Sequence, residues 1–218
     1  MKMKRVLKII GIIIAILIIL FLIHTIRNYV IVTGLQNKIK PYFNSSNYYM
    51  KSVTTSNDGT TVTMDYYKKD NKQVAFLERN LNGEISKISI YNNGERIDRF
   101  FNNKEDKIAE LDSDMAMTVN LYNGLESESK WQTFLSCISA NIKSVNYNGK
   151  ECYSIKGFMS LTSLNSEDSE TIIDKNTGLL VKLTFGEEQS EKEYKFDNVD
   201  DSIFTEPDIS EYTLKDKE

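Results

Sequence analysis

A single run of apolar residues near the N-terminus constrains this chain more than any other feature of its sequence. Residues 6–23 read VLKIIGIIIAILIILFLI and are all apolar except Lys8 and Gly11. An α-helix of this length is about 27 Å long, close to the ~30 Å thickness of the hydrocarbon core of a bilayer. The sequence therefore predicts a helix that crosses a membrane.

The run is either an uncleaved anchor or a signal peptide that is removed. Signal peptides have a shorter apolar region, followed by small residues at the cleavage site. Residues 21–27 read FLIHTIR and offer no such site, so we expect an uncleaved anchor. The basic flank MKMKRVLK predicts a cytoplasmic N-terminus, a single pass through the cell membrane, and an extracytoplasmic position for everything after Arg27. His24, the only histidine, lies at the outer end of the run, where we expect an interfacial residue rather than a proton sensor.

The charge of the chain is unevenly distributed along the sequence. Residues 1–28 carry five basic residues and no acidic one, which leaves 22 basic against 31 acidic residues in 29–218. Nucleic-acid binding depends on Lys and Arg that neutralise phosphates, so the acidic part is a poor candidate for it. We therefore expect the membrane, and no nucleic acid, among the partners of this chain.

Beyond the anchor at 1–28 we expect a short connector at 29–33 and one extracytoplasmic domain at 34–218. The apolar positions in 34–43 have the spacing of an amphipathic helix, which Pro41 shortens or kinks. No internal repeat and no low-complexity linker divides the remaining chain.

Most of this domain has the pattern of β-strands joined by turns rich in Asn and Gly. The expected strands lie at 48–56, 60–69, 71–80, 84–93, 95–101, 150–158, 170–175, 179–185 and 191–199. Between the two series, residues 113–143 lack strand alternation and include a stripe at helical spacing, formed by Trp131, Phe134, Leu135 and Ile138. The prediction is an α+β fold in which a single antiparallel sheet carries helices on one face.

The residues that most enzymes need are missing from the predicted domain. Its lack of histidine removes Ser–His and Cys–His pairs, and no phosphate-binding loop, nucleophile elbow or zinc-protease motif occurs. Its acidic clusters lack the spacing of a calcium-binding loop. We expect no enzymatic activity, no cofactor and no metal.

Cys137 and Cys152 leave two interpretations open. Both lie in the exported part, where disulfides persist, and a bridge would close a loop worth about 3 kcal/mol. They are equally well explained as two buried free thiols that act as small apolar side chains.

The segments CYSIKG and TIIDKNTGLLVKLTFG, followed by Phe204, Pro207-Asp208 and Tyr212, resemble the lipoprotein-localisation (LolA-like) superfamily. The resemblance implies a strongly curved antiparallel half-barrel that wraps around helices and encloses an apolar cavity. The chain departs from lipoproteins of this kind because no lipid-attachment Cys lies near its apolar run. A carrier that moves freely between membranes is therefore not expected.

The resemblance also implies a function and a set of cavity residues. It implies a membrane-anchored binding module that holds a lipid or another hydrophobic ligand against five aromatic residues: Trp131 and Phe134 from the helical stripe, and Phe76, Phe158 and Phe185 from the sheet. The alternative is an extracytoplasmic sensor or protein-interaction domain with a fully packed core, which would act on a partner protein of the cell envelope. The volume of the cavity distinguishes the two.

Overall fold

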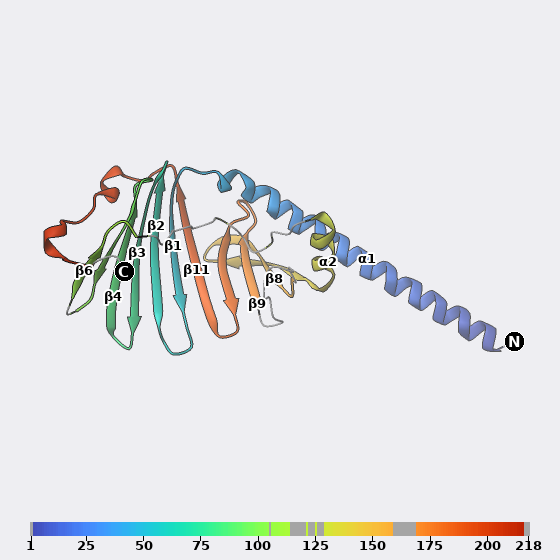
Figure 1. The fold of residues 1–218 in the computed structure, drawn as a ribbon. Coiled ribbons are helices and arrows are strands. Elements are labelled where there is room, and N and C mark those ends of the chain that lie inside the picture. The colour runs from blue at the N-terminus through green and yellow to red at the C-terminus, as the bar shows by residue number, and fades with distance from the viewer. Residues whose placement is uncertain are drawn as a thin grey trace. The chain divides into compact units, whose positions relative to one another are not determined.

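A computed structural model of the chain describes residues 2–104, 106–113, 121, 125, 129–158 and 169–215. The fold is α+β, with a long N-terminal helix, a short second helix and an open, curved sheet of 12 strands (Figure 1). The first part of the expected helical segment, including Met115, Met117 and Val119, lies outside the described residues.

The strand order of the sheet is β12-β6-β5-β4-β3-β2-β1-β11-β10-β9-β8-β7. The bounds are β1 Asn47–Thr55, β2 Thr61–Lys69, β3 Lys72–Leu81, β4 Glu84–Asn92, β5 Ile97–Asn102, β6 Lys107–Glu110, β7 Asn141–Tyr147, β8 Lys150–Lys156, β9 Ser169–Asp174, β10 Leu180–Phe185, β11 Glu188–Phe196 and β12 Thr213–Leu214. The sheet is mixed rather than purely antiparallel, because β12 pairs with β6 in parallel after the C-terminal tail has crossed the sheet. All nine expected strands are present, and β6, β7 and β12 are additional.

The chain divides into two compact units, which are described separately. Unit 1 comprises residues 1–39 and 122–179, and unit 2 comprises 40–121 and 180–218.

Unit 1 contains nearly all of helix α1, which runs without interruption from Lys2 to Phe43. The expected connector at 29–33 is therefore helical. Its helical form follows from a stripe of five buried residues at alternating spacings of three and four, a pattern that keeps one side of a helix against its neighbours. These residues are at most 2% exposed: Thr25, Asn28, Val32, Leu35 and Ile39. Pro41 lies only two residues before the helix ends, so it interrupts nothing.

The second helix of unit 1, α2 (Lys130–Ser139), is shorter than the helical segment that the sequence predicts. Ser129 caps its N-terminus, because the Ser129 hydroxyl accepts a hydrogen bond from the backbone N–H of Gln132. It ends before Ala140, and residues 141–143 belong to β7 instead. Ile142 explains this end, because it is buried on β7 opposite Ile155 of β8.

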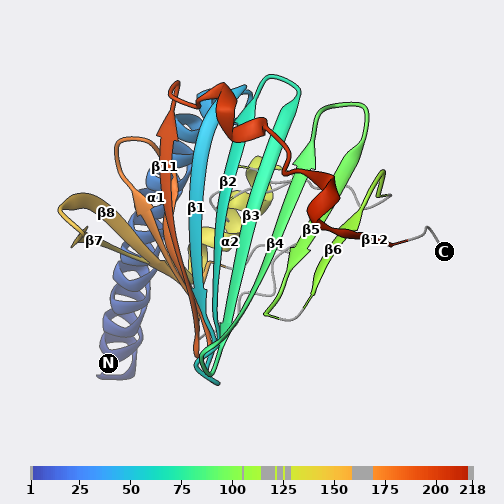
Figure 2. The ribbon, with the colours of Figure 1, turned by 90° about the vertical axis from the view of Figure 1, so that its left-hand side faces the viewer.

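The hairpins of unit 2 follow the turns that the sequence indicates. Asn82 and Gly83, between β3 and β4, both have positive φ, as a two-residue turn between antiparallel strands requires. One face of this sheet carries Val74, Tyr91 and Phe100, and we call it the tail face. The C-terminal tail, with its short helices η1 (Asp201–Phe204) and η2 (Ile209–Glu211), packs on it and crosses β2 to β5 (Figure 2).

The opposite face of unit 2, which we call the second face, has its own buried cluster. Tyr48, Met50, Tyr66 and Ala75 are at most 2% exposed there, and Leu121 packs against them. Both faces of the sheet in unit 2 are therefore apolar.

Candidate functional site

A row of apolar side chains crosses the second face of unit 2, beside its buried cluster. The strand register places one residue of each strand from β6 to β2 directly opposite the next. We call these five residues the apolar row: Ile108, Phe101, Ile88, Leu77 and Met64. All five are half-buried. Because neighbouring strands lie about 4.8 Å apart, the row is about 19 Å long.

The apolar row ends in polar residues on the next two strands. Ser52 of β1 lies opposite Met64, and Lys192 of β11 lies opposite Ser52. The hydroxyl of Ser52 is 3.2 Å from that of Ser190. Burial lowers the pKa of Lys192, because an ammonium group is disfavoured where water is excluded. One end of the row therefore combines hydroxyl groups with a partly desolvated amine.

The neighbouring residues of the second face are fully packed. Met50 and Tyr66 are each 1% exposed, and the hydroxyl of Tyr66 donates a hydrogen bond to the side chain of Gln73. Burial raises the pKa of Tyr66, so this hydroxyl stays protonated. The apolar row differs from this cluster because it keeps part of its apolar surface exposed.

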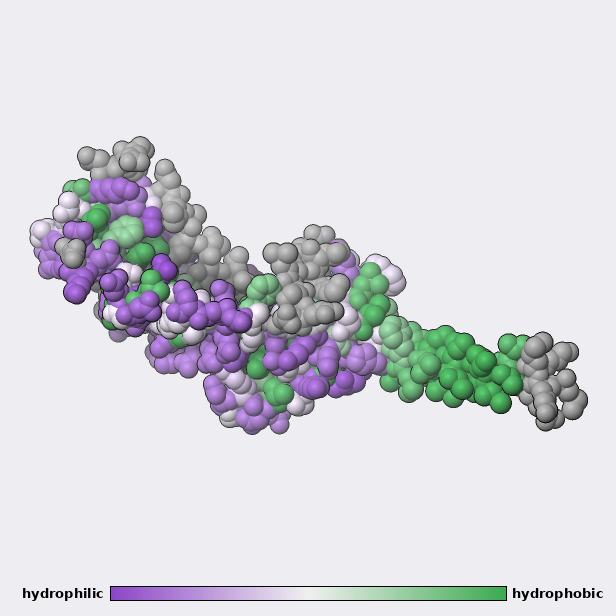
Figure 3. Space-filling model, turned by 90° about the horizontal axis from the view of Figure 1, so that it is seen from below, coloured by the Kyte–Doolittle hydropathy of each residue, from purple (hydrophilic) through white to green (hydrophobic). Residues whose placement is uncertain are grey.

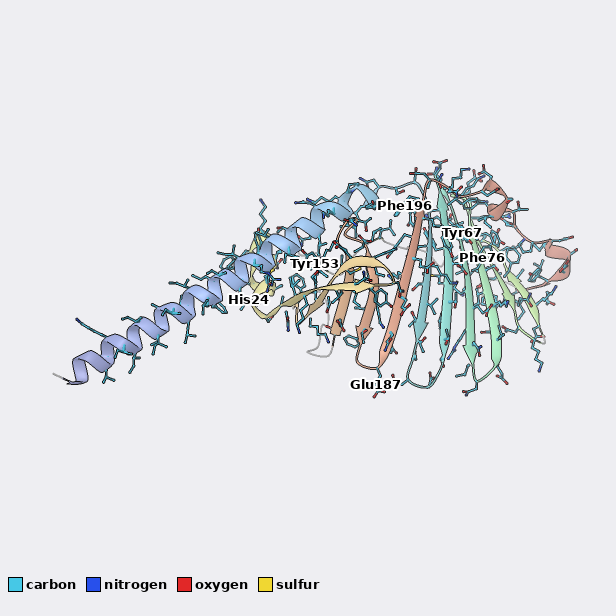
Figure 4. All side chains as sticks on the ribbon, turned by 180° about the vertical axis from the view of Figure 1, so that it is seen from behind. His24, Tyr67, Phe76, Tyr153, Glu187 and Phe196 are labelled. Atoms are coloured by element: carbon cyan, nitrogen blue, oxygen red, sulfur yellow. The ribbon has the colours of Figure 1, made fainter. Side chains whose placement is uncertain are left out.

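The tail face, in contrast, is covered by aromatic packing. The rings of Phe76 and Tyr91 meet edge to face, as do those of Phe100 and Tyr212. Tyr67 of β2 and Phe76 of β3 lie side by side on this face (Figure 4). Phe76 thus belongs to the contact between sheet and tail.

The five residues expected to line a cavity are distributed over both units. In unit 2, Phe76 is on the tail face, whereas the alternation along β10 places Phe185 on the second face, at the end of the strand and 45% exposed. In unit 1, Phe158 is 3% exposed within the core. Trp131 and Phe134 stack with ring centroids 5.7 Å apart. The structure therefore brings Trp131 and Phe134 together and separates Phe76 from Phe185.

Cys137 and Cys152 are free thiols in the structure, and both are fully buried in unit 1. Burial raises the pKa of Cys137 to about 11 and also raises that of Cys152. A thiol in such surroundings stays protonated and reacts poorly. In this structure both residues act as small apolar side chains.

The sequence analysis missed the apolar row, although the sequence contains the signal that defines it. Asn82-Gly83 fixes the register of β3 on β4, which places Leu77 opposite Ile88. The pairing of β3 with β2 and of β4 with β5 then places Met64 opposite Leu77 and Phe101 opposite Ile88. Among the residues that the structure describes, no group of three His, Cys, Asp or Glu side chains is placed to hold a metal ion.

The second functional feature is the first half of α1. Its side chains from Val6 to Ile23 are apolar except at Lys8 and Gly11 and form a long hydrophobic stretch on the face shown in Figure 3, and none of this stretch is buried against the protein. Its length and composition fit a single membrane anchor or a signal sequence.

No protein-family model and no curated protein matches this chain. The apolar row and the N-terminal helix are therefore the two features on which a function can be proposed.

Proposed function

We propose that this protein is a membrane-anchored extracytoplasmic binding module that holds a lipid-like ligand along the apolar row. The observation that carries the proposal is the unbroken register of five half-buried apolar side chains on successive strands. A sheet face that only packed against the rest of the protein would bury these side chains as fully as it buries Met50 and Tyr66.

An elongated apolar ligand suits this row on energetic grounds. Burying each 100 Å² of apolar surface is worth about 2.5 kcal/mol, and an acyl chain laid across the strands removes its own surface and that of the row from water. Such binding needs no specific hydrogen bonds along the chain. A row without any charged residue, as seen here, is therefore sufficient for binding an acyl chain.

The polar end of the row suits the carboxylate or phosphate of the same ligand. An anion near Lys192 would favour the charged form of its amine, which burial disfavours, and the hydroxyls of Ser52 and Ser190 can donate hydrogen bonds to that anion. The row thus has the polarity of a fatty acid or a phospholipid, with one charged end and a long apolar remainder.

The anchor and its orientation are part of the proposal. The apolar run at 6–23 and the basic residues before it support a helix with its N-terminus in the cytoplasm and both units outside. The sheet shares its curvature with the half-barrel that the resemblance to the lipoprotein-localisation superfamily implies, but it is mixed rather than purely antiparallel.

A photoreactive fatty acid incorporated with the full-length protein in lipid nanodiscs tests the proposal. After irradiation, mass spectrometry should find adducts on peptides that contain Met64, Leu77 or Ile88. Residues 6–23 should also be labelled, because they lie in the bilayer. Met64→Gln, which keeps the length of the side chain but makes it polar, should reduce the unit 2 adducts several-fold.

The matched control is Thr63→Gln on the same strand. Thr63 is also half-buried, but alternation places it on the tail face, so this variant should label like the unmodified protein. Labelling of residues 6–23 without adducts on the apolar row would contradict the lipid-binding proposal. It would favour the alternative, an interaction domain that acts on a protein partner.

A further inference from the structure

Helix α2 carries an apolar stripe on the side directed away from the core of unit 1. Trp131 is 66% exposed and Leu135 is 44% exposed. With the half-buried Ile138, they recur at positions four and then three residues apart, which is one side of a helix. The buried side of α2 consists of small residues, including Thr133 and Cys137. Trp131 and Leu135 therefore face outward, whereas Phe134 packs against Tyr29 of α1.

The stripe lies next to the outer end of the apolar run of α1. His24 directly follows residues 6–23, and its Nε2 is 3.2 Å from the carbonyl oxygen of Ala140, which ends α2 (Figure 4). One turn further along α1, the ring of Tyr29 meets that of Phe134. A bilayer that holds residues 6–23 would therefore place its headgroup layer beside α2.

The charges of α2 itself suit a surface that meets lipid headgroups. None of the 31 acidic residues lies in residues 1–43 or in 129–143, and the nearest ones before α2 in the sequence are Glu126 and Glu128. Arg27, Lys130 and Lys143 are exposed in these segments. Each basic residue near an anionic bilayer surface adds to binding by electrostatic attraction.

We propose that α2 is a second membrane contact, which lies in the headgroup layer with Trp131 and Leu135 inserted towards the acyl chains. This proposal rests on the membrane anchor proposed above. Tryptophan is favoured at this depth because its ring is apolar and its N–H remains hydrated. With α1 crossing the bilayer and α2 lying on it, unit 1 is held against the membrane at two points.

Trp131 is the only tryptophan of the chain, so its fluorescence reports on α2 alone. The full-length protein is reconstituted into vesicles of zwitterionic and anionic phospholipid that contain a lipid nitroxide near the headgroup. We expect the nitroxide to quench Trp131 strongly and aqueous iodide to quench it weakly. Leu135→Glu should weaken lipid quenching several-fold, because it places a charge in the inserted stripe. Ile85→Glu, at an equally exposed apolar residue of β4, should leave it unchanged.

Flotation of the same vesicles separates failure of this proposal from failure of the anchor. Protein that floats with the vesicles, but whose Trp131 is quenched by iodide and not by the lipid nitroxide, would overturn the proposal and leave the anchor standing. Protection of Trp131 from both quenchers would mean that Trp131 is covered by protein, within the same chain or from a second copy, and would also overturn the proposal. Protein that does not float would overturn both.

Discussion

Gly178 lies where the turn after β9 meets the backbone of α1. Its φ is +73°, and a Cβ atom at this position would lie 2.5 Å from the carbonyl oxygen of Leu35 and 3.0 Å from the backbone nitrogen of Ile39. Asp174 shapes this turn, because its carboxylate accepts hydrogen bonds from the backbone N–H groups of Asn176 and Thr177. Glycine is required here for both its conformation and its size.

Gly178→Ala should therefore destabilise unit 1 more than an ordinary glycine substitution does. The left-handed backbone costs a non-glycine residue about 1–2 kcal/mol, and displacement of α1 adds to that, for an expected total of about 3 kcal/mol or more. Gly186→Ala is the matched control, because Gly186 also has positive φ but nothing lies within 4 Å of its added Cβ. Urea unfolding of the full-length protein in detergent micelles measures both. Equal losses from the two variants would contradict the close contact with α1.

The turn at Asp174–Gly178 could be predicted from the sequence, whereas its contact with α1 could not. Turn chemistry is local, because Asp, Asn and Gly favour these conformations wherever they occur. The contact with Leu35 joins residues more than a hundred positions apart, and no pattern within either segment encodes it.

At the scale of elements, the buried stripe of α1 makes a polar contact with α2. Asn28 is fully buried, and its Nδ2 donates hydrogen bonds to the carbonyl oxygens of Cys137 (3.2 Å) and Ala140 (2.7 Å). The last carbonyls of a helix have no donor within the helix itself. Asn28 of α1 therefore caps the C-terminus of α2.

Asn28→Ala should destabilise unit 1 by about 1–3 kcal/mol, because it removes the buried amide that donates to both carbonyl oxygens. Asn28→Asp should cost more, because a carboxylate accepts hydrogen bonds and would face two other acceptors. Val30→Ala, on the exposed side of the same helix, should have little effect. Hydrogen exchange of α2 in the full-length protein should accelerate in both Asn28 variants. Unchanged exchange in Asn28→Asp would show that this contact does not hold α2.

The elements that the sequence predicted well are those with a strong local pattern, such as the strands β1 to β5 and their turns. The helical segment expected over 113–143 contains α2, but α2 covers only Lys130–Ser139 and its apolar stripe does not form its buried side. The small residues Thr133, Ser136 and Cys137 are buried instead. β12 has only two residues, which is too short for alternation to be visible in the sequence.

At the scale of the whole molecule, the chain has two apolar surfaces in different surroundings, the run at 6–23 and the apolar row. The run at 6–23 is exposed on all sides of its helix, as a membrane-spanning segment requires. The apolar row, in contrast, lies on one face of a sheet and is half-buried. None of the five aromatic residues expected to line a cavity belongs to this row. The row is defined by the register of neighbouring strands, which aromatic side chains alone do not indicate.

Native mass spectrometry of the full-length protein released from detergent micelles tests most directly whether the apolar row holds a lipid. We expect a protein ion that retains one acyl lipid at collision energies that remove loosely attached lipid. Ile88→Asn should lose this bound species, because it puts a polar amide in the middle of the row. Ser89→Asn, the neighbouring change on the tail face, should keep it. Only bare protein at these energies, or equal retention in both variants, would contradict the binding of a lipid along the apolar row.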